Sequence, residues 1–202
     1  MWLRNYGRDT RRSTVALGAA LAASAALVLG GCGAAYVEGD TASVLLLVEN
    51  VGEGTPVLSD VRGENGLIVN CQIDVTVSAR PKNPNSPVGA SEDVRVARYT
   101  VSYRRADGRA VEGLDVPYRI SGNVSTLVSS DGTSSTTVTV DLVRHQAKLE
   151  PPLNNISGLQ VVTMFADITI VGQTVSGKTV TSSGTAQVTF ADFADGTATC
   201  EG

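Results

Sequence analysis

The chain has a single histidine, His145, and histidine is the side chain whose charge changes near neutral pH. A nucleophilic hydrolase pairs such a base with an activated serine, which some hydrolases present in a G-x-S-x-G turn. The sequence contains no such turn, and His145 stands in the stretch LVRHQAKLEPPL, shortly before two prolines. We interpret His145 as a surface histidine beside a proline-bounded turn, so the sequence does not favour nucleophilic hydrolysis.

The acidic residues give no clearer catalytic pattern. Glycoside hydrolysis needs two acids that face each other across a cleft. The sequence contains no calcium-binding loop of the D-x-D-x-D-G type. Asp131-Gly132 and Asp195-Gly196 are typical turn formers. The other acids considered are Glu92, Asp93, Asp107, Asp192 and Glu201. The sequence therefore predicts no catalytic residue, no metal site, no cofactor and no enzymatic activity.

A more specific signal precedes Cys32, in the tetrapeptide Leu29-Gly30-Gly31-Cys32. An arginine-rich start and an apolar segment from Val15 to Leu29 have the layout of a secretory signal. The tetrapeptide resembles the bacterial lipobox, which has an aliphatic residue three positions before the cysteine and small residues between. This resemblance implies that residues 1–31 are a signal peptide and that Cys32 becomes the lipid-modified N-terminus.

An uncleaved membrane anchor is the alternative for this segment. The apolar core is shorter than the ~20 residues of a spanning helix, but residues 14–35 approach that length with their small flanks. In the lipoprotein interpretation, residues 32–42 are a lipidated tether that attaches the protein to a membrane of the bacterial cell envelope. The periplasmic side of the outer membrane is favoured in a host with two membranes, because Gly33 stands where a retention signal has aspartate.

The charge of the mature chain argues against nucleic acid as a partner. One of the 20 acidic residues and four of the 16 basic residues lie within residues 1–31, which leaves 19 and 12 and a net charge of −7. Nucleic-acid binding draws most of its affinity from basic residues that neutralise phosphates. We therefore exclude DNA and RNA binding.

The two remaining cysteines, Cys71 and Cys200, form an even pair in an exported protein, which favours a disulfide. Such a bridge would pin the C-terminus to the body and add up to about 4–5 kcal/mol in the chain-entropy model. Two free thiols are the alternative. Neither cysteine has the close cysteine or histidine neighbour of a redox CxxC or zinc site.

Alternating apolar residues predict strands along the rest of the chain. In Val94–Arg105 the alternation shifts between Val96 and Tyr99, as a β-bulge would cause. Turns are expected at Asp107-Gly108 and Ser176-Gly177, and Asp131-Gly132 predicts a hairpin. The predicted strands are Ser43–Glu49, Gln72–Ala79, Val94–Arg105, Val116–Ile120, Asn123–Ser129, Ser135–Val143, Leu159–Val171 and Thr179–Phe190.

This pattern predicts an all-β domain over residues 43–202, with about 7–9 strands. We favour an antiparallel β-sandwich of immunoglobulin-like or fibronectin-like topology, and a closed antiparallel barrel is the alternative. One or two helical turns could form between Leu142 and Leu149, but Pro151-Pro152 excludes a helix running through this region.

The segments KNPNSP, LVRHQAKLEPPL and VTFADFADG resemble those of a group of uncharacterised bacterial lipoproteins with one predicted β-sandwich. The resemblance implies an envelope location and transfers no catalytic residue. Our leading hypothesis is a non-enzymatic interaction module with an unknown envelope protein as its partner. The irregular segments 81–92 and 144–158 are the candidate surfaces. An abundant structural lipoprotein and an envelope hydrolase are the alternatives.

Overall fold

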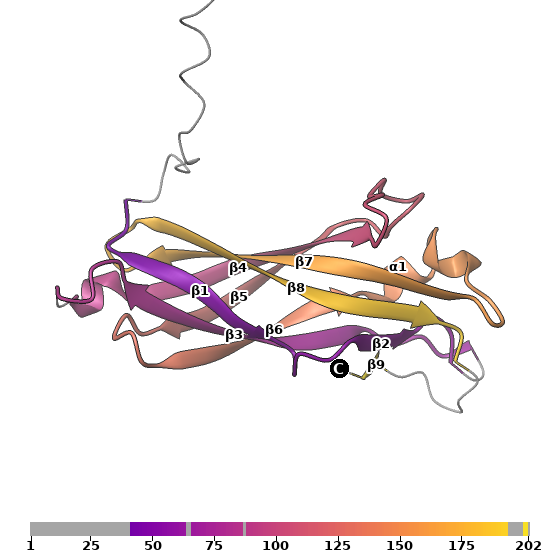
Figure 1. Cartoon of the computed structure of the whole chain (residues 1–202), viewed down its shortest axis with the longest axis horizontal. Coiled ribbons are helices and arrows are strands. Elements are labelled where there is room, and N and C mark those ends of the chain that lie inside the picture. The colour runs from indigo at the N-terminus through magenta and orange to yellow at the C-terminus, as the bar shows by residue number, and fades with distance from the viewer. Residues whose placement is uncertain (1–40, 64–65, 87, 194–199, 202) are drawn as a thin grey trace, which may run out of the picture. The chain divides into compact units, whose positions relative to one another are not determined.

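The computed structural model describes residues 41–63, 66–86, 88–193 and 200–201, which form a sandwich of two β-sheets (Figure 1). One sheet has three strands in the order β1-β3-β6, and the other has six in the order β5-β4-β7-β8-β2-β9. The strands are β1 (Val44–Val51), β2 (Val57–Asp60), β3 (Cys71–Pro81), β4 (Val94–Arg105), β5 (Ile120–Val128), β6 (Ser135–Val143), β7 (Val161–Thr174), β8 (Thr179–Ala191) and β9 (Cys200–Glu201). The short helices are η2 (Ala90–Glu92), α1 (His145–Lys148) and η3 (Leu153–Asn155).

The sheet order confirms the predicted sandwich. Immunoglobulin-type domains place strands A, B and E in one sheet and C, F and G in the other. Here β1, β3 and β6 correspond to the first set and β4, β7 and β8 to the second, with β5 at the edge of the second sheet. Strand β2 pairs with β8 in parallel, whereas the other described strand pairs are antiparallel. The described strands form two separate ladders, so the barrel alternative is not observed.

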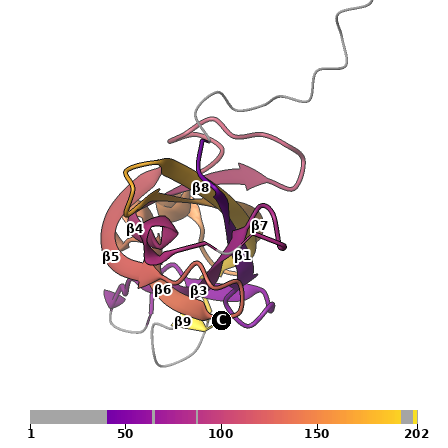
Figure 2. The same cartoon turned by 90° about the vertical axis from the view of Figure 1, so that its left-hand side faces the viewer.

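The core lies between the two sheets and comes from the alternation seen in the sequence (Figure 2). Alternate side chains of β3 and β6 face those of β4, β7 and β8, and most of them are valine or isoleucine, which pack well on pleated sheets. The bulge predicted in β4 is present, because the register with both neighbouring strands shifts between Val96 and Arg98. The shift restores the inward direction of Tyr99, Val101 and Tyr103.

Two tyrosines of β4 cross this core and bind the backbone of the opposite sheet. The hydroxyl of Tyr103 donates a hydrogen bond of 2.6 Å to the carbonyl of Leu142, and the hydroxyl of Tyr99 accepts one of 3.0 Å from the amide of Asp141. The Leu142 carbonyl and the Asp141 amide both belong to β6. These bonds fix how the two sheets sit on each other, since apolar contacts alone are not directional.

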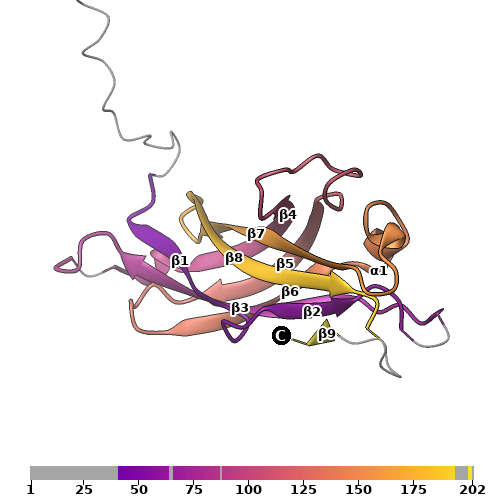
Figure 3. The ribbon, with the colours of Figure 1, turned by 45° about the vertical axis from the view of Figure 1, so that its right-hand side comes forward.

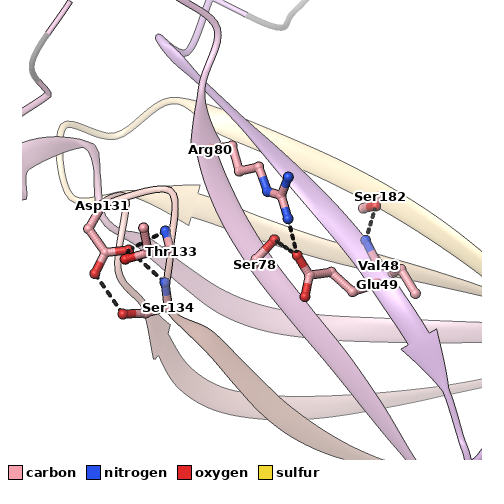
Figure 4. A network of polar contacts seen from close by, with 8 residues as sticks. All are labelled: Val48, Glu49, Ser78, Arg80, Asp131, Thr133, Ser134 and Ser182. Atoms are coloured by element: carbon pink, nitrogen blue, oxygen red, sulfur yellow. Dashed lines mark hydrogen bonds and ion pairs between the residues drawn. The ribbon is translucent and has the colours of Figure 1, made fainter. Parts of the chain in front are cut away.

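The sandwich is closely packed along the side where β1 meets β8. The amide of Val48 donates to the hydroxyl of Ser182 across the two sheets, at 3.0 Å (Figure 4). Within the first sheet, Glu49 accepts hydrogen bonds from Ser78 and Arg80 of β3. Gly184 of β8 leaves room for β1, because a Cβ there would lie 2.7 Å from Val51.

The structure corrects two of the predicted strands. Val116–Ile120 and Asn123–Ser129 were expected as separate strands, but a single strand β5 starts at Ile120, and Val116 forms only an isolated bridge with Glu112. The Asp131-Gly132 turn exists, yet β5 and β6 do not pair as a hairpin. The turn instead carries the chain from one sheet to the other, which local turn chemistry cannot distinguish from a hairpin.

Two short strands were missed, and they lie together at one edge. Strand β2 has four residues and pairs with β8, and β9 has two residues and pairs with β2 (Figure 3). Segments this short show no clear alternation, so their pairing depends on tertiary contacts. The predicted turns at Asp107-Gly108 and Ser176-Gly177 are confirmed, with both glycines at positive φ, and α1 is the helical turn expected after Leu142.

Candidate functional site

The strand register divides the loops between two ends of the sandwich. The entry end contains the start of β1, where Val44 pairs with Pro81, and the connections 82–86, 88–93, 129–134 and 175–178. The far end contains the start of β3, where Cys71 pairs with Val143, and the segments 61–63, 66–70, 106–119 and 144–160. In Figure 1 the entry end is on the left and the far end is on the right. The two candidate surfaces, 81–92 and 144–158, thus lie at opposite ends.

The acids of the entry end hold its loops together. The largely buried carboxylate of Glu92 accepts hydrogen bonds from the amide of Ser43, the hydroxyl of Ser176 and the ammonium of Lys178. Burial acts to raise the pKa of Glu92, but these hydrogen bonds and the charge of Lys178 outweigh it and lower the pKa. Asp93 accepts from the amide and hydroxyl of Ser130. These contacts give both acids a structural role.

Asp131 organises its own turn at the same end. Its carboxylate accepts hydrogen bonds from the amides and hydroxyls of Thr133 and Ser134 (Figure 4). The hydrogen bonds from Ser134 lower the pKa of Asp131 most, followed by the bond from the Thr133 amide. This geometry supports the sequence interpretation of Asp131 as a turn former.

The far end contains a buried charged group that the sequence does not reveal. Lys148, the last residue of α1, is only 2% exposed, and its ammonium donates a hydrogen bond of 2.7 Å to the carbonyl of Asp60 on β2. Burial lowers the pKa of Lys148 from 10.5 to about 8, and the nearby charge of Asp60 acts in the opposite direction. Desolvation of a lysine favours its neutral form in this way.

The side chain of Asp60 is buried beside this lysine. One carboxylate oxygen, Oδ1, accepts from the amides of Arg62 and Phe193. The other, Oδ2, has no hydrogen-bond partner among the described residues. A buried and unpaired carboxylate oxygen is costly, so Asp60 and Lys148 together form the most polar point in the described core.

The predicted disulfide between Cys71 and Cys200 is present next to Lys148. The two Cα atoms are 5.2 Å apart, and the bond ties the start of β3 in one sheet to β9 in the other. Cys71 is fully buried, whereas Cys200 is partly exposed. Ser59 Oγ lies 3.3 Å from Cys71 Sγ and donates to it, because a disulfide sulfur carries no proton. Lys148 Nζ lies 3.9 Å from the same sulfur.

A hollow of about 410 Å³ opens beside this cluster. Its walls combine apolar side chains with the polar groups of Arg62, Lys148 and Asn154. The lining includes Val61, Arg62, Ile68, Lys148, Leu149 and Leu153. A second hollow of about 390 Å³ lies on the outer face of the three-stranded sheet and is lined by threonines with Gln72 and Asp74. Neither lining is mainly apolar, and the first hollow is the one that adjoins the buried Lys148.

Exposed apolar side chains concentrate at the far end. Of the eleven large apolar residues that are exposed in the described part of the chain, six belong to the far-end segments, and a seventh, Val161, begins β7 at the same end. They are Leu67, Val111, Leu114, Tyr118, Leu149, Leu159 and Val161. Leu45, Leu127 and Val175 belong to the entry side. Apolar side chains gathered in loops at one end are typical of a surface that contacts another molecule.

The structure does not assemble the other sequence candidates into a site. His145 is exposed, and its contact is made through its backbone amide, which donates to Asn70. Within the described residues, no three histidine, cysteine or acidic side chains could share a metal ion. Asp107 pairs with Arg109. Cys32, Asp195 and the side chain of Glu201 lie outside the described residues, as does the 1–31 segment.

Sequence reasoning found the two cysteines but missed Lys148, Asp60 and Ser59. A lysine in HQAKLEPP is expected to be solvated, and Asp60 lies in a strand too short to recognise. Comparison with protein-family models, curated proteins and solved structures finds no match to this chain. No described helix has the length and apolarity needed to cross a bilayer.

Proposed function

We propose that the protein is a lipid-anchored binding module of the bacterial cell envelope, with its recognition surface at the far end of the sandwich. The observation that carries this proposal is the separation of the two ends. The chain enters the sandwich at the entry end, and the exposed apolar side chains gather in the far-end loops. Loops presented by a rigid sandwich are the usual place for recognition.

The lipobox-like segment supports the anchor. From Cys32 to Val44 the chain could extend about 40 Å at most, at ~3.5 Å per residue. A lipid on Cys32 would therefore keep the entry end within reach of the membrane surface. The far-end loops would then be free to meet a second protein of the envelope.

The chemistry of the far end favours binding over catalysis. Its hollow has a mixed apolar and polar lining, and its charged pair consists of a lysine and an aspartate buried in the core. A partner with apolar side chains would gain free energy by covering the exposed leucines and valines, at roughly 25 cal/mol per Å² removed from water.

Photo-cross-linking in cells tests where the partner binds. A photoreactive amino acid replaces Leu159, which is fully exposed at the far end, and in a matched control it replaces Val175, which is 61% exposed at the entry end. We expect a discrete protein adduct from position 159 and none of the same mass from position 175. Equal adducts from both positions, or none from position 159, would contradict the proposal.

A further inference from the structure

The two sulfurs of the Cys71–Cys200 bridge have very different surroundings. Cys71 is fully buried and its sulfur lies near two groups that favour a negative charge, the Ser59 hydroxyl at 3.3 Å and the Lys148 ammonium at 3.9 Å. Cys200 belongs to the two-residue strand β9 and is partly exposed. The bond therefore joins a partly exposed cysteine to a cysteine whose thiolate would be stabilised by its neighbours.

This difference between the two cysteines favours thiol–disulfide exchange at Cys200. A thiolate attacks one sulfur of a disulfide, and the reaction is faster when the attacked sulfur is accessible and the departing thiol has a low pKa. A cysteine beside a lysine loses its proton more readily than a free cysteine. We propose that this bridge is a thiol–disulfide exchange site for an envelope dithiol protein, in which Cys200 is attacked and Cys71 leaves.

The proposed reaction has two balanced steps. In the first, a partner thiolate forms a bond to Cys200 Sγ, the Cys71–Cys200 bond breaks, and Cys71 leaves as a thiolate paired with Lys148. In the second, the other thiol of the partner loses its proton to water and attacks the partner's own sulfur in the mixed disulfide. Cys200 is then released and takes a proton from water. The bridge is reduced to the Cys71 thiolate and the Cys200 thiol, and the partner, which entered as one thiolate and one thiol, is oxidised to a disulfide.

Reduction would also change an edge of the larger sheet. Among the described residues, β9 pairs with β2 at Leu58 and Ser59, and we expect reduction of the disulfide to release this short strand. Without it, the outer edge of β2 loses its partner while its other edge stays paired with β8. An unpaired strand edge can accept an added strand, so exchange would couple the redox state to a new binding edge.

The first test locates the attack on the folded, unaltered chain. The protein is incubated with reduced glutathione, free thiols are alkylated after acid quenching, and the modified peptides are identified by mass spectrometry. We expect glutathione on Cys200 and the alkyl group on Cys71. Glutathione on Cys71, or no adduct until denaturant is added, would overturn the proposal.

The second test measures the contribution of Lys148 to the rate. Lys148→Met removes the ammonium and keeps a side chain of similar length, and we expect it to slow native-state exchange about tenfold. Lys178→Met is the matched control, because Lys178 pairs with Glu92 at the entry end, and it should exchange at the original rate. In denaturant all three proteins should react alike.

Loss of the ammonium and partial unfolding would change the exchange rate in opposite directions, so the second test separates them. Partial unfolding of the Lys148→Met variant would expose the bridge and speed its reduction, which is the opposite of the expected effect. Ser59→Ala removes the hydroxyl without changing a charge and should also slow exchange. An unchanged rate in both variants would show that neither group stabilises the departing thiolate.

Discussion

At Lys148 a charged side chain occupies a buried position next to the core. Its ammonium is held by the carbonyl of Asp60 and lies near a disulfide sulfur, while the carboxylate of Asp60 keeps one oxygen unpaired. Replacing such buried polar groups by apolar ones is often neutral or stabilising. A role in exchange at the neighbouring bridge would give a reason for a lysine at this position.

The burial of Lys148 predicts that stability rises at alkaline pH. Its folded-state pKa of about 8 lies below the ordinary value of 10.5, so the unfolded chain binds more protons between these values. The free energy of unfolding should then rise as pH increases from about 8 toward about 10. Urea unfolding across this window checks the slope, and Lys148→Met should lose it. A slope that survives in the variant would contradict this assignment.

The buried hydroxyl of Tyr103 predicts a second effect of a single residue on stability. Burial raises the pKa of Tyr103, and its hydrogen bond to Leu142 links the two sheets. Tyr103→Phe should lower the free energy of unfolding by about 1 kcal/mol, because the Leu142 carbonyl loses its partner. Tyr118→Phe is the control, since that tyrosine is 53% exposed. Equal midpoints in urea for the two variants would argue against the inter-sheet bond.

At the scale of elements, the pairing of β4 with β5 depends on a glycine. Gly122 of β5 lies opposite Tyr99 of β4, and a Cβ at this position would overlap the tyrosine ring. The ring cannot move freely, because its hydroxyl accepts a hydrogen bond from Asp141 in the opposite sheet. The close approach of the two strands is therefore tied to the packing of the sheets.

Gly122→Ala should lower the free energy of unfolding by about 1–3 kcal/mol through this overlap. Gly89→Ala is a suitable control, because the nearest atom to its Cβ would be Ser91 Oγ at 3.9 Å. Thermal or urea unfolding with the disulfide intact compares the two. If the two variants are equally stable, Tyr99 can relax and the proposed constraint is absent.

Most long strands could be predicted from alternation, because β3, β4, β6, β7 and β8 each bury one face over many residues. The bulge in β4 was also visible as a shift in that alternation. The pairing after Asp131-Gly132 could not be predicted, since the same turn serves a hairpin or a change of sheet. Strands β2 and β9 were missed because two to four residues carry too little periodicity.

Across the whole molecule, the disulfide links the two sheets and closes most of the chain into one loop. Cys71 and Cys200 are 129 residues apart. Their pairing could be predicted from their even number and from the expected export, but the lysine and serine around them could not, because these groups meet only through the fold.

Removal of this bridge should cost about 2–4 kcal/mol of unfolding free energy. Cys200→Ser tests this by urea unfolding, and the unaltered chain treated with reductant should behave in the same way. The expected loss comes mainly from greater freedom of the unfolded chain. A variant as stable as the oxidised protein would show that the bridge adds little to the stability of the fold.

One measurement tests both the proposed anchor and the bridge. It is the intact mass of the native protein extracted from membranes, taken before and after reduction. The account predicts a chain that begins at Cys32 and is heavier by a diacylglyceryl group. It also predicts that reduction adds the mass of two hydrogen atoms. An unmodified chain that still begins at Met1 would contradict the lipid anchor and make residues 14–35 the membrane segment.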